Sequence, residues 1–211
     1  MTAIQGLVST FGGRASTITL PAPAPDVSWV VVHQTPELTP PPDALLARDD
    51  VTYVPQPGRG LSRSRNAALE AATGDHLFVL DDDVTVNLDA MRAVAALARE
   101  HGAQVVASYH RFTDGTSTRP ASARAHPLGR LGVGSPTSID LSFRRDALAA
   151  RGVRFDTDFG LGARYGSCEE AVFLGDCLSA GLSVWRLPLE VATHAPVTSG
   201  QDFYSSAARV E

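Results

Sequence analysis

The strongest constraint on the fold is segment 76–83, where an apolar run of strand length ends in three consecutive acids, Asp81, Asp82 and Asp83. Alternation along a strand would place Asp81 and Asp83 on one side and Asp82 on the other. Adjacent carboxylates repel one another, so we expect a positive charge to compensate them. A divalent cation is the simplest candidate, because its remaining positions could take phosphate oxygens. The alternative is a solvated acidic turn after a core strand.

Predicted strands and helices alternate along the rest of the chain. The predicted strands are 4–8, 27–32, 51–54, 76–80, 103–109, 182–187 and 189–193, with an extended segment at 138–143. The predicted helices are 40–48, 62–72 with Ser62 as N-cap, the segment between Asn87 and Gly102, 144–151, 167–180 and a last one from Gln201. This order indicates an α/β sandwich with a mostly parallel sheet, in one domain over residues 1–211.

Polar residues follow several of these strands. Thr10 and Gln34 come after the first two strands, and Asp81 to Asp83 end the fourth. In parallel α/β sheets, ligands bind beyond the carboxyl ends of the strands. We therefore expect these residues to meet in one site.

Composition excludes several functional classes. The net charge is −5, which argues against a nucleic-acid-binding protein. All 18 basic residues are arginine, so a phosphate-loop or Schiff-base lysine is impossible. The two cysteines form no disulfide framework, and no apolar stretch reaches transmembrane length or resembles a signal peptide. These features predict a cytoplasmic protein without a transmembrane segment.

Segment 114–137 interrupts the α/β pattern. No acid occurs between Asp114 and Asp140, whereas Arg119, Arg124 and Arg130 lie there among frequent glycines and prolines. Long irregular segments in compact domains are usually functional or mobile. We predict a mobile loop here, and both an anion-binding role and a plain surface loop remain open.

Five segments together carry a family resemblance. They are, in order, 58–69, 72–83, 155–163, 169–173 and 193–194. The first contains Arg65-Asn66, the second ends in Asp81-x-Asp83, and the fourth begins with Glu169-Glu170. In this order and spacing they resemble the inverting family 2 glycosyltransferases, over most of residues 4–200. The resemblance implies the GT-A fold, a Rossmann-like α/β/α sandwich, and transfer of a hexose from a nucleoside diphosphate sugar, most simply a UDP-sugar, to a hydroxyl acceptor.

The same resemblance implies a metal-dependent donor site. Asp81 would face the nucleoside, Asp83 would bind Mn²⁺ or Mg²⁺, and Asp81 could be a further ligand. His194 could add an imidazole ligand, which Mn²⁺ accepts more readily than Mg²⁺; the alternative is an ordinary histidine at a strand end. The remaining donor-binding candidates are Thr10, Gln34, Arg65, Asn66 and Asp82.

The acid pair would supply the catalytic base. Inverting displacement needs one base to take the acceptor's proton, and the resemblance assigns this to Glu170. However, Ser167-x-x-Glu170 is also a capping box, which would leave Glu169 as the base. Asp140 and Asp158 are weaker candidates for contacts with the acceptor.

Departures from the family keep other functions open. The second strand is followed by His33-Gln34 where an acid is common, although a glutamine amide can still bind a uracil-like edge. Phe11-Gly12-Gly13-Arg14 faintly resembles the phosphate loop of a sugar-nucleotidyltransferase. A non-catalytic nucleotide-sugar-binding module is the remaining alternative.

Overall fold

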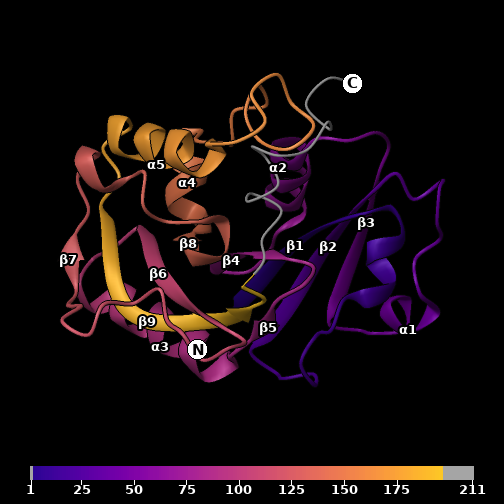
Figure 1. Ribbon diagram of the computed structural model, residues 1–211, viewed down its shortest axis with the longest axis horizontal. Helices are drawn as coiled ribbons and strands as arrows, with labels where there is room; N and C mark the ends of the chain where they lie inside the picture. The colour runs from indigo at the N-terminus through magenta and orange to yellow at the C-terminus, as the bar shows by residue number, and fades with distance from the viewer. Residues whose placement is uncertain (1, 197–211) are drawn as a thin grey trace.

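The structure is a computed structural model that describes residues 2–196, and its centre is one mixed sheet (Figure 1). The strands are β1 (Ile4–Phe11), β2 (Val27–Gln34), β3 (Val51–Gln56), β4 (His76–Asp81), β5 (Thr85–Val86), β6 (Val105–Phe112), β7 (His126–Pro127), β8 (Leu141–Arg144) and β9 (Val184–His194). Their order in the sheet is β3-β2-β1-β4-β8-β6-β9-β5, and β7 also pairs with β9. The long pairings, β1 with β2 and β4, β2 with β3, and β6 with β9, are parallel. The predicted α/β sandwich with a mostly parallel sheet is confirmed.

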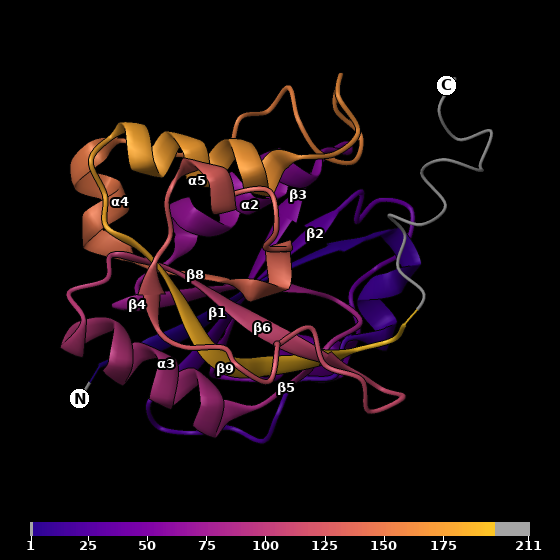
Figure 2. The same ribbon diagram turned by 60° about the vertical axis from the view of Figure 1, so that its left-hand side comes forward.

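Helices cover both faces of this sheet. The helical segments are η1 (Gly12–Thr17), α1 (Asp43–Leu46), α2 (Leu61–Ala71), α3 (Leu88–Glu100), η2 (Arg130–Gly132), η3 (Ser138–Asp140), α4 (Arg145–Arg151) and α5 (Glu169–Ser179). Helices α2, α4 and α5 lie on one face, and α3 lies on the other (Figures 1 and 2). Two apolar cores result, one on each side of the sheet.

Strand β2 shows why the sequence produces this layering. Val30 and Val32 pack into the core beneath α2 and α5, whereas Trp29 and Val31 pack into the core beneath α3. A strand covered on both faces must be apolar at successive positions. The continuous run of valines therefore predicts a central strand of an α/β sandwich.

Local polar contacts decide two boundaries that the sequence predicts differently. Segment 138–143 is not one extended segment, because Asp140 and Thr137 form a capping box that folds residues 138–140 into η3. Helix α2 has Gly60 as its N-cap, and the predicted cap Ser62 instead donates from Oγ to the Phe159 carbonyl.

The two short strands predicted around Pro188 are one continuous strand, β9. Its register with β6 shifts between the pairs Ala107–Arg186 and Tyr109–Glu190. Pro188 lies within this irregularity, where the missing N–H of a proline is tolerated. The predicted cap of α3 is confirmed, since the Asn87 side chain accepts from the Ala90 N–H.

Two predictions from the sequence are not tested by the structure. Segment 114–137 contains β7 and η2, and its mobility stays a prediction. The helix predicted from Gln201 lies outside the described residues. Across residues 2–196, no helix combines the length and apolar character needed to cross a membrane.

The close contact between β1 and β2 predicts a large effect of one added methyl group. A Cβ at Gly6 would overlap the Trp29 ring and touch Leu80. We expect Gly6→Ala to destabilise the protein by about 1–3 kcal/mol in urea denaturation, because Trp29 and Leu80 belong to the closely packed core beneath α3. Gly175→Ala on α5 is the control, since a Cβ there meets nothing within 4 Å. Equal stability of the two variants would contradict this account.

Candidate functional site

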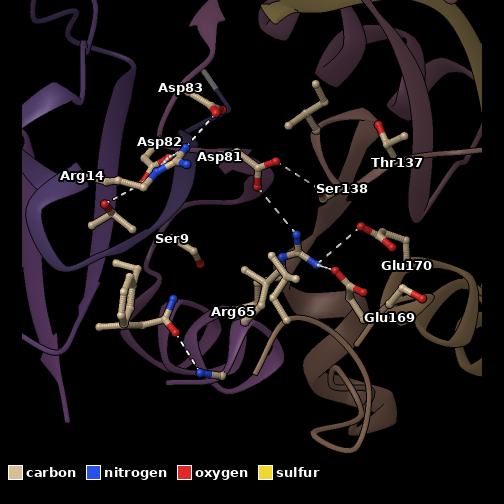
Figure 3. Close-up of a pocket in the computed structure, with 18 of the residues that line it drawn as sticks. Ser9, Arg14, Arg65, Asp81, Asp82, Asp83, Thr137, Ser138, Glu169 and Glu170 are labelled. Carbon is tan, nitrogen blue, oxygen red and sulfur yellow. Dashed lines mark hydrogen bonds and ion pairs between the residues drawn. The ribbon is translucent and has the colours of Figure 1, made fainter. Parts of the chain in front are cut away.

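A cavity of about 540 Å³ opens at the carboxyl ends of β1, β2, β4 and β6, within the size range of small-molecule sites (Figure 3). Its walls come from strand ends, from the starts of α2 and α5, and from η3. The lining residues used below are Ser9, Thr10, Phe11, Arg14, Gln34, Arg59, Gly60, Arg65, Asp81, Asp82, Asp83, His110, Thr137, Ser138, Cys168, Glu169, Glu170 and His194. Thus the acids after β4 and the acid pair of α5 line the same cavity.

Arg65 connects these two groups of acids. Its Nη1 donates to Glu169 Oε1 at 2.9 Å and lies 3.8 Å from Glu170 Oε1, while its Nη2 lies 3.7 Å from Asp81 Oδ1. The arginine is only 2% exposed. A buried guanidinium needs anionic partners. Arg65 lies in α2, and its partners lie at the end of β4 and at the start of α5.

Desolvation changes the acidity of two of these carboxyl groups. Burial raises the pKa of Asp81, against the opposing effect of Arg65. Burial and the neighbouring Glu169 carboxylate raise the pKa of Glu170 to about 7, although Arg65 acts in the opposite direction. Glu169 makes the direct hydrogen bond to Arg65, and the raised pKa of Glu170 allows its carboxyl group to exchange a proton near neutral pH.

The start of α5 leaves Glu170 available for this role. The capping box predicted between Ser167 and Glu170 does not form, because Cys168 is the N-cap and makes no side-chain capping bond. Cys168 has a left-handed backbone with φ of 73°, which turns the chain sharply into the helix. Ser167 Oγ contacts Cys168 Sγ instead.

The acids that follow β4 are compensated by an arginine that the sequence analysis did not assign to the site. Arg14, in η1, donates from Nε to Asp82 at 2.9 Å and from Nη2 to both Asp82 and Asp83. Thr10 Oγ1 also donates to Asp82, at 2.7 Å. Asp82 is therefore held inside the wall, whereas Asp83 is half exposed. Arg14 could have been identified because it follows β1, which ends at the same sheet edge.

Asp83 and His194 are the residues that could hold a metal ion. His194 Nδ1 donates to the Ala195 carbonyl, so the Nε2 of a neutral ring carries a lone pair, and Nε2 lies 3.1 Å from Asp83 Oδ1. Two such electron-rich atoms need a proton or a metal ion to compensate them. Carboxylate oxygen and imidazole nitrogen are both suitable ligands for Mn²⁺.

The predicted third ligand, Asp81, faces Arg65 and Ser138, and its Oδ2 accepts from Ser138 Oγ at 3.4 Å (Figure 3). Among the described residues, no group of three or more histidine, cysteine or acidic side chains is arranged to hold a metal. A cation here would therefore use few protein ligands and would take the rest of its coordination shell from a bound anion and water.

The cavity wall also carries the amide of Gln34 and the aromatic ring of Phe11. Gln34 Oε1 accepts from the Gly60 N–H at 2.9 Å, so the amide NH₂ is the part left to donate to a ligand. Nearby, the Arg59 guanidinium lies 4.4 Å from the centroid of the Phe11 ring. These groups suit a flat, carbonyl-bearing ring.

Three predicted site residues do not line the cavity. Both ends of the Asn66 amide bond the Phe155 backbone, and Asp158 is exposed outside the cavity. Asp140 is 2% exposed and accepts from His110 Nδ1 at 2.9 Å. His110 was not predicted from the sequence, because its side chain reaches the cavity wall only through the position of β6 in the sheet.

The sequence matches a family model and a curated relative. The family model described as "Glycosyl transferase family 2" matches residues 41–170. Succinoglycan biosynthesis protein ExoM of Rhizobium meliloti (strain 1021) is 33% identical over 160 residues, and the match covers 70% of this chain and 48% of that protein. The chain thus spans about half the length of this curated relative.

Solved structures of S. aureus TarS share the fold. The structure of TarS 1-349 superposes with a TM-score of 0.68 at 17% identity, covering 95% of this chain and 62% of that chain. TarS 1-349 in complex with UDP-GlcNAc gives a TM-score of 0.71 at 16% identity, covering 93% and 59%.

The ion pairs of Arg65 predict a pH-dependent loss of stability. Arg65→Ala should destabilise the protein by about 3–5 kcal/mol at pH 8, because it leaves carboxylates buried without a counter-charge. Glu170 has a raised folded-state pKa, so its contribution to stability is greatest below its unfolded pKa and is lost as pH rises through about 7. The destabilisation measured by urea denaturation should therefore be smaller at pH 5.5.

Arg63→Ala is the matched control, because Arg63 is exposed on the same helix. It should change stability little at either pH. A loss for Arg65→Ala that is the same at both pH values would indicate a packing effect and not an electrostatic one.

Proposed function

The chain belongs to glycosyl transferase family 2, and from this premise we propose that it is a metal-dependent inverting glycosyltransferase. It would move a hexose from a nucleoside diphosphate sugar, most simply a UDP-sugar, to a hydroxyl acceptor. The observation that carries the proposal is the shared cavity, in which Arg65 joins Asp81 to Glu169 and Glu170. This arrangement supports the proposal because residues suited to bind a donor and a residue suited to accept a proton line one cavity.

The charges around the cavity support a bound cation. Five carboxylates and three guanidinium groups line it, so the wall is net negative when all five carboxylates are ionised, even with Arg14, Arg59 and Arg65 present. A diphosphate would be repelled by this wall without further positive charge. Asp83 and His194 would hold Mn²⁺ or Mg²⁺, which when bound would neutralise charge on the departing diphosphate.

Glu170 is the proposed base. Its ionised carboxylate would accept the proton of the acceptor hydroxyl while that oxygen attacks the anomeric carbon. The bond from the anomeric carbon to the phosphate oxygen would break on the opposite side, releasing the nucleoside diphosphate with inversion. Glu169, bound to Arg65, would keep the guanidinium in place beside Asp81.

Uridine is the proposed nucleoside. The free amide NH₂ of Gln34 can donate to a uracil carbonyl, and Phe11 with Arg59 offers a surface for the ring. The structural neighbour TarS has been solved with UDP-GlcNAc and with UDP. Where this NH₂ donates to O4 of uracil, cytosine would present its N4 amino group, a second donor, which gives a basis for discrimination.

Asp83→Ala tests the metal proposal without requiring a known acceptor. UDP at about 100 times its Kd, with Mn²⁺, should raise the Tm of the wild type by roughly 5–10 °C. The variant should lose this metal-dependent shift but keep its fold, because Asp83 is half exposed. Asp176→Ala, which removes an exposed acid on α5, should retain the full shift. A full shift in Asp83→Ala would count against the metal assignment.

Glu170→Gln tests the base. Loss of proton transfer should lower kcat by about 10²–10⁴-fold, measured as UDP release from a UDP-sugar with acceptor. In the wild type, kcat/KM should rise as pH increases through about 7, since Glu170 must be ionised to accept a proton. Asp176→Asn is the acid-to-amide control on the same helix.

The assay also separates the alternative functions. Pyrophosphate formation from a nucleoside triphosphate and a sugar phosphate would indicate a nucleotidyltransferase. If the protein binds a UDP-sugar but no acceptor supports turnover, it is a binding module. A reduction below tenfold in Glu170→Gln would assign the base to another residue.

A further inference from the structure

A buried histidine–aspartate pair in the cavity wall has no part in the reaction described above. His110, on β6, is 4% exposed, and Asp140, in η3, is 2% exposed. His110 Nδ1 lies 2.9 Å from Asp140 Oδ1. His110 lines the cavity, whereas Asp140 lies behind it.

The surroundings of Asp140 fix the tautomer of His110. Asp140 Oδ2 accepts from the Thr137 backbone N–H at 3.0 Å and from Thr137 Oγ1, so this carboxylate acts as an acceptor at both oxygens. His110 Nδ1 must then carry the hydrogen that Asp140 Oδ1 accepts. In the neutral ring, Nε2 is left as a lone-pair acceptor, and it has no hydrogen-bond partner within residues 2–196.

The orientation of the ring is equally restricted. The His110 backbone bonds Thr118 through both its N–H and its carbonyl, and Phe112 packs edge-on against the ring with centroids 5.1 Å apart. Ser108 Oγ donates to the Asp140 carbonyl at 2.9 Å, which ties η3 to β6. Such a prearranged acceptor costs little entropy when a ligand binds it.

The position of His110 indicates which part of the donor would meet it. In the parallel pairing of β6 with β9, His110 is opposite Ala192, and Phe112 is opposite His194, the proposed metal ligand. On the other side, η3 contacts Asp81 through Ser138. His110 thus lies two residues from Phe112, the β6 partner of the proposed metal ligand, so the sugar attached to a diphosphate bound there would lie close to it.

We propose that His110 Nε2 accepts a hydrogen bond from a hydroxyl of the donor sugar and that Asp140 positions the ring for this contact. The inference rests on the proposed function, since it assumes a nucleoside diphosphate sugar in this cavity. It assigns His110 a part in sugar recognition. It also gives Asp140 a role different from the direct acceptor contact that the sequence predicts.

His110→Asn separates this role from a purely structural one. The asparagine amide can still donate to Asp140, replacing Nδ1, but it places no atom where Nε2 was. We expect a cooperative urea transition with a moderate loss of stability, since the packing of the ring against Phe112 is lost, and unchanged affinity for UDP. Affinity for UDP-glucose or UDP-N-acetylglucosamine, whichever the wild type binds more tightly, should fall roughly 3- to 10-fold, the effect of one lost hydrogen bond.

The measurement is the ratio of the Kd for the UDP-sugar to the Kd for UDP, obtained by calorimetry with Mn²⁺ present. His126→Asn, at an exposed histidine outside the cavity, is the matched control and should leave the ratio unchanged. Asp140→Ala should raise the ratio as well, because the ring loses its fixed orientation.

The outcomes distinguish this inference from the function on which it rests. If wild-type protein binds UDP but His110→Asn leaves the ratio unchanged, the contact with the sugar is overturned while the donor site stands. If wild-type protein binds neither UDP nor a UDP-sugar, the proposed function fails and the inference fails with it.

Discussion

A single buried guanidinium, that of Arg65, is the interaction on which the cavity depends. It lies between Asp81 at the end of β4 and Glu169 and Glu170 at the start of α5. Without it, desolvated carboxylates from two remote parts of the chain would face one another, and their mutual repulsion would oppose the packing of α5 against the sheet. The same contact makes the two acids of α5 unequal, since Glu169 receives the hydrogen bond and Glu170 keeps a raised pKa.

The remaining acids show how the fold can form before any ligand binds. Arg14 and Thr10 bind Asp82, and Arg14 also binds Asp83, which lies at the cavity surface beside His194. The sequence predicts that a positive charge must balance these acids, and arginines supply part of that charge within the chain itself. With all of its carboxylates ionised the wall is still net negative, which is one of the observations behind the proposed cation.

Predictions that rest on periodicity and on strand ends agree closely with the structure. The run 27–32 is an interior strand, and Thr10, Gln34 and Asp81, predicted from strand ends, line one cavity. Predictions that rest on a single polar side chain are less reliable, because such a side chain has several partners within reach. Ser62 bonds Phe159, which is 97 residues away, instead of capping its own helix, and the Ser167 capping box is displaced by the left-handed Cys168.

The amino-acid sequence by itself determines the α/β layering and the sheet edge at which the acids lie, because burial on two faces and the direction of each strand follow from local patterns of apolar and polar residues. Only the tertiary structure decides which side chains meet there. Asn66 and Arg65 are adjacent in sequence, yet one bonds a loop backbone and the other enters the cavity. Arg14 and His110 reach the site through pairings between segments far apart in the chain, and the energies of such contacts depend on burial and distance, which no local pattern contains.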